Sequence, residues 1–163
     1  MGTRRTIGIS LLIATIFAGG CIVAVQKGVG TLLGPNGSMT VTADNGGLAQ
    51  GERIGSVDVR EQDGLGVPDR NFQLVSAAVK QALEGQDLYS RATGDIELSL
   101  NITRYVNQPG KKVLDITATL TRGDSIVGTA TMSANLNGFG SREEVAKAIG
   151  KATIGFIDNI NDN

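Results

Sequence analysis

Two pairs of carboxylates are the first places where this sequence could carry acid–base chemistry. Glu143 and Glu144 are adjacent, and Asp95 and Glu97 alternate, so the second pair falls on one face of an extended strand. Acid–base catalysis needs a cleft and a second group that perturbs the pKa of the first. Asp95 and Glu97 have no basic or metal-binding neighbour, so we interpret them as solvated charges. Glu143 and Glu144 suit the first turn of a helix, where the macrodipole favours acidic residues.

The composition removes several other kinds of site. The 163 residues include no His and a single Cys, which excludes Cys/His zinc sites and Ser-His-Asp or Cys/His nucleophiles. The 15 basic and 16 acidic residues give a formal charge of −1 without a long block of either sign, which argues against nucleic acid as a partner. We therefore predict a protein that is not an enzyme and that needs no metal and no cofactor. A cell-envelope hydrolase or transferase that uses carboxylates alone stays open as the alternative.

The single cysteine, Cys21, stands at the end of a secretion signal. Arg4 and Arg5 precede an apolar run from Ile7 to Phe17, and the small residues Ala18–Gly20 come directly before Cys21. A charged start, a short apolar run and a small-residue cleavage site are the parts of a signal peptide. Because the cysteine follows the small residues directly, the segment resembles a bacterial lipoprotein signal. We predict that residues 1–20 are removed and that Cys21 is the lipid attachment site.

Two other interpretations of this segment stay open. The apolar character continues to Val25, so Thr6 to Val25 is long enough for an uncleaved membrane-spanning helix. The second interpretation is that the protein is secreted without a lipid and that Cys21 is an ordinary buried thiol. Ile22 follows the cysteine where Asp would favour inner-membrane retention, and resemblance to enterobacterial lipoproteins therefore predicts an anchor in the outer membrane, on its periplasmic face. Residues 21–52, rich in Gly, are predicted to be a tether between the lipid and the domain. A weak alternation over Ser38 to Ala43 leaves an edge strand open within it.

Three successive runs between Asp95 and Leu136 alternate apolar and polar residues, which is the pattern of strands with one buried face. Short links separate them, at Asn107–Gly110 and Arg122–Asp124, and both contain turn residues. The pattern predicts an antiparallel meander whose apolar face carries residues 96, 98, 100 and 102, then 114 to 120 in steps of two, then 126 to 136 in steps of two. Its other face is rich in Thr, Ser and Asn.

Two amphipathic helices flank this meander. One is predicted from Asp69, as N-cap, to about Glu84, and the other follows the capping box that begins at Ser141 and carries Phe156 in its apolar stripe. A further strand is predicted over Arg53–Arg60. The order predicts an α+β fold for residues 53–163, a two-layer sandwich of an antiparallel sheet, the three-stranded meander plus one or two further strands, with two helices on one face.

The stretch from Arg53 to Ile160 resembles a family of small periplasmic lipoprotein domains. The residues that carry the resemblance are Val57-Asp58-Val59, the helix through Val79 and Leu83, Gly94–Leu98 and the closing helix. The family is the group named DUF4410, with distant similarity to the α/β domain of the curli-secretion and penicillin-binding-protein-activator lipoproteins. The resemblance implies envelope assembly or accessory binding, and it implies no catalytic residue.

The polar face of the meander is the candidate binding surface. Thr117, Thr119, Thr129 and Thr131 present short hydroxyl side chains there. We predict that this face, or an adjacent exposed edge strand, docks a protein partner or a glycan, although the solvent face of any antiparallel sheet has the same pattern. Together these features predict a lipid-anchored, non-enzymatic periplasmic binding or assembly accessory protein. Its expected partners are the membrane, through the N-terminal lipid, and another envelope protein.

Overall fold

The computed structural model of the chain describes residues 31–32, 37–137 and 141–162, with the side chains described from residue 37 onward except that of Asn137. The predicted signal peptide and the predicted lipid attachment at Cys21 lie outside these residues. Within them, no helix is both long enough and apolar enough to cross a membrane.

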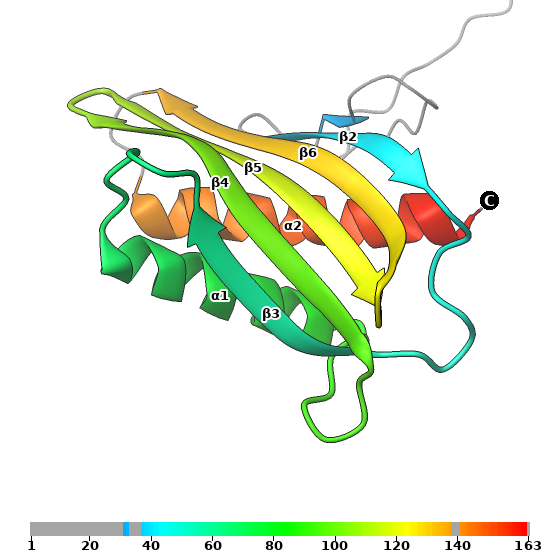
Figure 1. The fold of residues 1–163 in the computed structure, drawn as a ribbon. Helices are drawn as coiled ribbons and strands as arrows, with labels where there is room; N and C mark the ends of the chain where they lie inside the picture. The colour runs from blue at the N-terminus through cyan, green and yellow to red at the C-terminus, as the bar shows by residue number, and fades with distance from the viewer. Residues whose placement is uncertain (1–30, 33–36, 138–140, 163) are drawn as a thin grey trace, which may run out of the picture.

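The described chain folds as one sheet covered by two helices. Both helices of the described residues lie on the same face of the sheet, and no described residue forms a helix on the opposite face (Figure 1). The elements are β1 (Thr31–Leu32), β2 (Gly37–Asp44), β3 (Ile54–Glu61), α1 (Asp69–Glu84), β4 (Ile96–Gln108), β5 (Lys111–Arg122), β6 (Ser125–Asn137) and α2 (Arg142–Asn161). The predicted α+β two-layer sandwich, with its meander β4-β5-β6, is confirmed.

The sheet is mixed rather than antiparallel throughout. Its strand order is β1-β2-β6-β5-β4-β3, and every neighbouring pair is antiparallel except β3 and β4, which are parallel. The prediction of an antiparallel sheet is therefore wrong for β3. The chain leaves β3, runs through α1 and returns to β4, and a connection through a helix brings the next strand back in the same direction.

The sheet begins before residue 53, with the edge strand that the sequence left open over Ser38 to Ala43. Gly37–Asp44 forms β2, which pairs with β6 from Gly37 opposite Ala134 to Asp44 opposite Gly128. The last part of the predicted 21–52 tether thus belongs to the sheet. The alternation in β2 is short and weak, and its partner lies at the other end of the chain, so local patterning gave little indication of the pairing.

The core lies between the sheet and the helices. Leu100, Phe156 and the other large side chains there are fully buried, which confirms the predicted helix-on-sheet packing. The close approach of α2 to the sheet and to α1 depends on two glycines. A Cβ at Gly128 of β6 would lie 3.2 Å from two ring atoms of Phe156, and a Cβ at Gly150 of α2 would lie 2.9 Å from the carbonyl oxygen of Ala78 in α1.

Two bulges change which residues face the core. Residues 102 and 104 of β4 pair with 116 and 115 of β5, so Thr103 is an extra residue, and Val127 is the extra residue at the start of β6. As a result Val127 is buried and Ile126 is 50% exposed, so the prediction that Ile126 faces the core is wrong. The first bulge also puts Tyr105 beside Leu114, on the face that the helices cover.

The two helices begin differently. The capping box of α2 is confirmed, because the Ser141 hydroxyl accepts from the Glu144 N–H at 3.2 Å and the Glu144 carboxylate accepts from the Ser141 N–H at 2.7 Å. The predicted N-cap of α1 is wrong. Pro68 occupies that position in an extended conformation and Asp69 is the first helical residue, so α1 has no side-chain cap. Its macrodipole still favours the Asp69 carboxylate in the first turn.

Candidate functional site

The structure brings the four predicted threonines together on the uncovered face of the sheet. Thr117 of β5 stands opposite Thr131 of β6, and Thr119 stands opposite Thr129. Residues directly opposite in an antiparallel pair have Cβ atoms about 4.5–5.5 Å apart, so the four side chains form one compact patch. Thr131 is exposed and the other three are half-buried.

The patch extends along rows that cross neighbouring strands. Asn101 of β4 and Thr40 of β2 continue the row of Thr117 and Thr131, while Ser99 continues the row of Thr119 and Thr129. We call these residues the threonine face: Thr40, Ser99, Asn101, Thr117, Thr119, Thr129 and Thr131. It offers hydroxyl and amide groups and no ionisable side chain, so it suits docking by hydrogen bonds rather than acid–base chemistry.

An ionic cluster borders the threonine face. The carboxylate of Asp115 accepts a hydrogen bond from the Ser133 hydroxyl at 2.5 Å and lies 3.8 Å from the Arg104 guanidinium. Sequence reasoning missed this cluster because a continued alternation would place Arg104 on the core face. The alternating pattern of β4 ends at Thr103, and that interruption is the only signal of the bulge that turns Arg104 outward.

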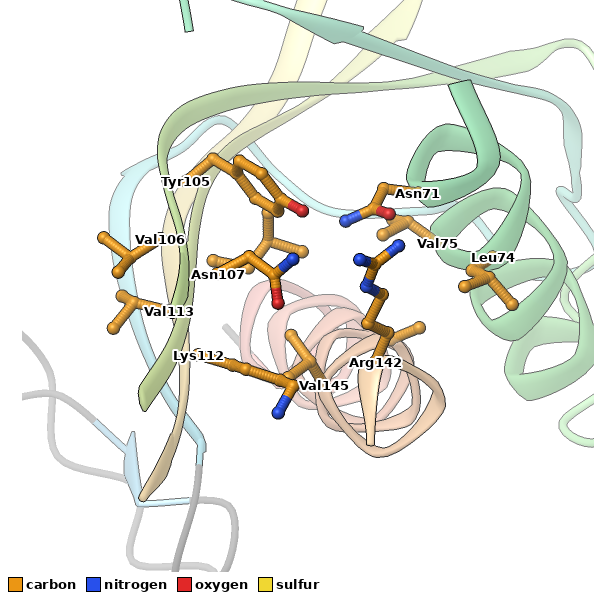
Figure 2. Close-up of a pocket in the computed structure, with 12 residues that line it drawn as sticks. Asn71, Leu74, Val75, Tyr105, Val106, Asn107, Lys112, Val113, Arg142 and Val145 are labelled. Carbon is orange, nitrogen blue, oxygen red and sulfur yellow. The ribbon is translucent and has the colours of Figure 1, made fainter. Parts of the chain in front are cut away.

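A small cavity lies on the other side of the sheet, where the first turns of α1 and α2 meet the β4-β5 hairpin. Its volume is about 20 Å³, about the size that one water molecule needs. Figure 2 shows the polar ends of Asn71, Tyr105, Asn107 and Arg142 pointing into the same space. The full lining is Asn71, Leu74, Val75, Tyr105, Val106, Asn107, Lys112, Val113, Leu114, Arg142, Val145 and Ala146.

Two polar atoms in this cavity are buried without a partner. The Oδ1 atom of Asn71 and the hydroxyl of Tyr105 have no hydrogen bond within the part of the chain that the structure describes, and Asn71 is only 7% exposed. Most buried polar atoms in proteins are paired, so each exception needs an explanation. One weak signal of this site is present in the sequence, because Asn71 precedes Val75 and Val79 at steps of four along the buried side of α1.

The carboxylates weighed in the sequence do not form a catalytic pair. Asp95 and Glu97 are exposed, as expected for solvated charges. Asp95 nevertheless has a basic neighbour, because it adds to the effect of the Glu52 hydrogen bond in raising the pKa of Arg122. A hydrogen bond from its own backbone N–H is the main reason that the pKa of Glu143 is lowered, and Arg70 at 3.5 Å contributes to the same shift. A hydrogen bond from the Arg122 side chain is the main cause of the lowered pKa of Glu52. Within residues 37–137 and 141–162, no three or more Asp, Glu, His or Cys side chains are grouped to hold a metal ion.

A second concave surface is an open groove of about 460 Å³ between the edge strand β3 and α1. Its walls are mainly apolar, with Val59 and Phe72 on opposite sides and Lys80 as the charged residue. Neither this groove nor the cavity is lined by an acidic side chain. The carboxylate-dependent enzyme alternative therefore gains no support from either place.

The fold is similar to that of a protein known as a dodecamer. The PelC dodecamer from Paraburkholderia phytofirmans aligns with a TM-score of 0.59 and 15% identity, over 74% of this chain and 97% of the PelC chain. A single-substitution variant of the same PelC, also a dodecamer, aligns with a TM-score of 0.59 and 17% identity over the same shares of the two chains. No protein-family model and no curated protein matches the sequence. At this identity the similarity concerns the fold, and the resemblance to DUF4410 stays a prediction.

Proposed function

We propose that this chain is a lipid-anchored, non-enzymatic accessory protein that binds a protein partner in the bacterial envelope, at the periplasmic face of the outer membrane. The observation that carries the proposal is the threonine face. Both helices cover one side of the sheet, while the other side presents rows of short polar side chains across four strands. The described residues leave these rows uncovered, with charged side chains such as Asp58 and Arg60 at their ends on β3. Such a surface supports docking, because each hydroxyl can both donate and accept.

The similarity to PelC supports copies of this chain as one class of protein partner. That protein forms a dodecamer, and the alignment covers nearly all of its chain. The present sheet also has an edge that can contact a neighbour. β3 lies at the edge of the sheet and its first residue, Ile54, bridges to Tyr89. Beyond Ile54, the outer side of β3 is where a second chain can pair with backbone N–H and C=O groups. Head-to-tail contacts between unlike surfaces produce closed rings when the rotation closes.

The anchor is tested by Cys21→Ala. Cells that express the wild-type chain should incorporate a fatty-acid analogue into the protein, and the variant should lose the label and move to the soluble periplasmic fraction. The physical reason is that an acyl chain contributes about 0.8 kcal/mol of membrane affinity for each buried CH₂ group. Membrane association of the unlabelled variant would support the spanning helix from Thr6 to Val25 instead.

The docking surface is tested by a triple substitution of Thr117, Thr119 and Thr131 to Arg in the full chain. Crosslinking in intact envelopes should yield partner adducts with the wild type and not with the triple variant, because bulk and unmatched charge block the face. Surface substitutions usually change the stability by within about ±0.5 kcal/mol each, so the variant should still fold.

The matched control adds the same three charges elsewhere. Gln73, Gln81 and Gln86 are exposed and lie on or just after α1, so Arg at these three positions should leave the adducts intact. Equal adducts from the folded threonine variant and from this control would show that the threonine face is only solvated. Loss of adducts from both variants would implicate net charge rather than the surface.

A further inference from the structure

The cavity at the start of the two helices combines features that the fold alone does not require. Asn71 buries an amide oxygen without a hydrogen bond in the described part of the chain, and the Tyr105 hydroxyl beside it is unpaired as well. An apolar side chain at position 71 would fill the space without leaving a polar atom unsatisfied. Sites where a sequence departs from such local rules are often functional sites.

Both charged residues in the lining of the cavity are cations, while the carboxylates of the adjoining first helical turns, Asp69, Glu143 and Glu144, lie outside the lining. Arg142 and Lys112 are the only charged residues in its lining, and neither belongs to an ion pair within 4 Å among the described residues. Arg142 is also the first residue of α2, where the macrodipole disfavours a cation. Both helices begin at this end of the sheet, so two positive helix ends converge on the cavity (Figures 1 and 2).

The walls between these groups are apolar. Leu74 and Val75 come from α1, and Val145 and Ala146 come from α2. Small-molecule sites are usually lined by apolar side chains and contain a few polar groups that point toward one place. The interior has room for only one water-sized group, so a ligand can insert one hydroxyl while the rest of it occupies the open mouth.

We propose that this cavity binds an acidic sugar, a hydroxylated ring that carries a carboxylate. In this arrangement one sugar hydroxyl donates to Asn71 Oδ1 and accepts from the Tyr105 hydroxyl, and the carboxylate pairs with Arg142. The hydroxyl satisfies the unpaired acceptor and the carboxylate compensates the Arg142 cation. The site lies on the helix-covered side of the sheet, so it does not depend on the threonine face.

The two tyrosines allow a direct measurement, because the chain has no Trp and its only tyrosines are Tyr89 and Tyr105. In the full chain with Tyr89→Phe, held in a polyoxyethylene detergent, all tyrosine emission comes from the cavity. Titration with D-glucuronate should change this emission in a saturable way, with half-saturation at a concentration at least tenfold lower than for D-glucose or acetate. The Tyr105→Phe protein, which keeps Tyr89, should not respond.

Two variants test which side chains bind the carboxylate and the hydroxyl of the sugar. In the Tyr89→Phe background, Arg142→Gln and Asn71→Leu should each weaken glucuronate binding at least fivefold, while Arg104→Gln, a charge on the outward face, should leave it unchanged. The melting temperature of each variant checks that it folds. The proposal is overturned if glucuronate gives no saturable change up to about 50 mM, a range that includes millimolar affinities. It is also overturned if glucose or acetate binds equally well, or if the folded Arg142→Gln and Asn71→Leu proteins bind as the parent does.

Discussion

The contact between Phe156 and Gly128 offers a quantitative test of the packing of α2 on the sheet. Phe156 is fully buried, and a Cβ added at Gly128 would lie 3.2 Å from its ring and 3.1 Å from the end of the Ile160 side chain. Phe156→Ala removes the ring and leaves a cavity, which should cost about 3–5 kcal/mol. Domains are usually stable by only about 5–15 kcal/mol, so this loss is a large fraction of the total.

A second substitution makes the test specific to this contact. Gly128→Ala alone inserts a methyl group against the ring, and overpacking of this kind should cost about 1–3 kcal/mol. In the Phe156→Ala protein the same methyl group enters the space left by the ring, so its cost should vanish or change sign. The two changes should therefore be non-additive by about 0.5–3 kcal/mol, in the direction that makes the double variant more stable than the sum predicts.

The assay is urea unfolding of the full chain in detergent, followed by circular dichroism, with thermal melts in parallel. Each kcal/mol shifts the melting temperature by about 2–8 °C for domains of 60–250 residues, so Phe156→Ala should lower it by at least about 6 °C. Ile126→Ala is the control, because Ile126 is half exposed on the other face and its removal should have little effect. A Phe156→Ala melt within about 2 °C of wild type, or strict additivity with Gly128→Ala, would refute the proposed packing.

Three further substitutions test other contacts. Gly150→Ala should lower the melting temperature although Ala favours a helix by about 1 kcal/mol, because the new Cβ would lie 2.9 Å from the Ala78 carbonyl oxygen; a higher melting temperature would contradict the close helix crossing. Because the pKa of Glu52 is lowered, its pairing with Arg122 stabilises the fold above the ordinary pKa of 4.5, and this contribution is lost as the pH falls through the lowered value. Glu52→Gln should therefore reduce the free energy of unfolding at pH 7. In acid the variant and the wild type should have equal stability, as measured by urea unfolding across pH. Asn71→Leu should raise the melting temperature, because an unsatisfied buried acceptor costs about 1–3 kcal/mol; a lower melting temperature would indicate a partner for Oδ1 that the apolar side chain removes.

The sequence predicted the parts of the fold that depend on local periodicity. Alternation from Ile96 to Ile102 and around Ile116 identified the buried face correctly, because each strand position faces opposite to its neighbours. The same argument failed at Ile126, where one extra residue reverses the faces. Bulges depend on pairing with the neighbouring strand, so a single run of sequence contains little information about them.

The candidate sites divide in the same way. The threonine patch was predictable because Thr117 and Thr119 lie on one face of β5, and Thr129 and Thr131 lie on one face of β6. Pairing of these two neighbouring strands places the four residues side by side. The cavity was not predictable. Asn71 is near the start of α1, Tyr105 is in the second half of β4, and Arg142 is the first residue of α2, so the three residues are far apart in the sequence. Asn71 on the buried side of α1 is a weak local signal, and only the tertiary arrangement brings its polar end together with those of Tyr105 and Arg142.

The pairing of β2 with β6 has a consequence for the order in which the domain assembles. Hairpins such as β4-β5 and β5-β6 close over short loops and form rapidly, whereas β2 must wait for a partner that begins almost at the other end of the domain. During synthesis from the N-terminus, β2 emerges long before β6 and can pair with it only after β6 is made, so the outer edge of β6 stays open until β2 docks. An open edge accepts any strand of matching register, including β2 from another copy. Copies held close together on a membrane would then exchange this strand more readily than dilute copies, and the length of chain before Gly37 would decide how far the exchange can reach.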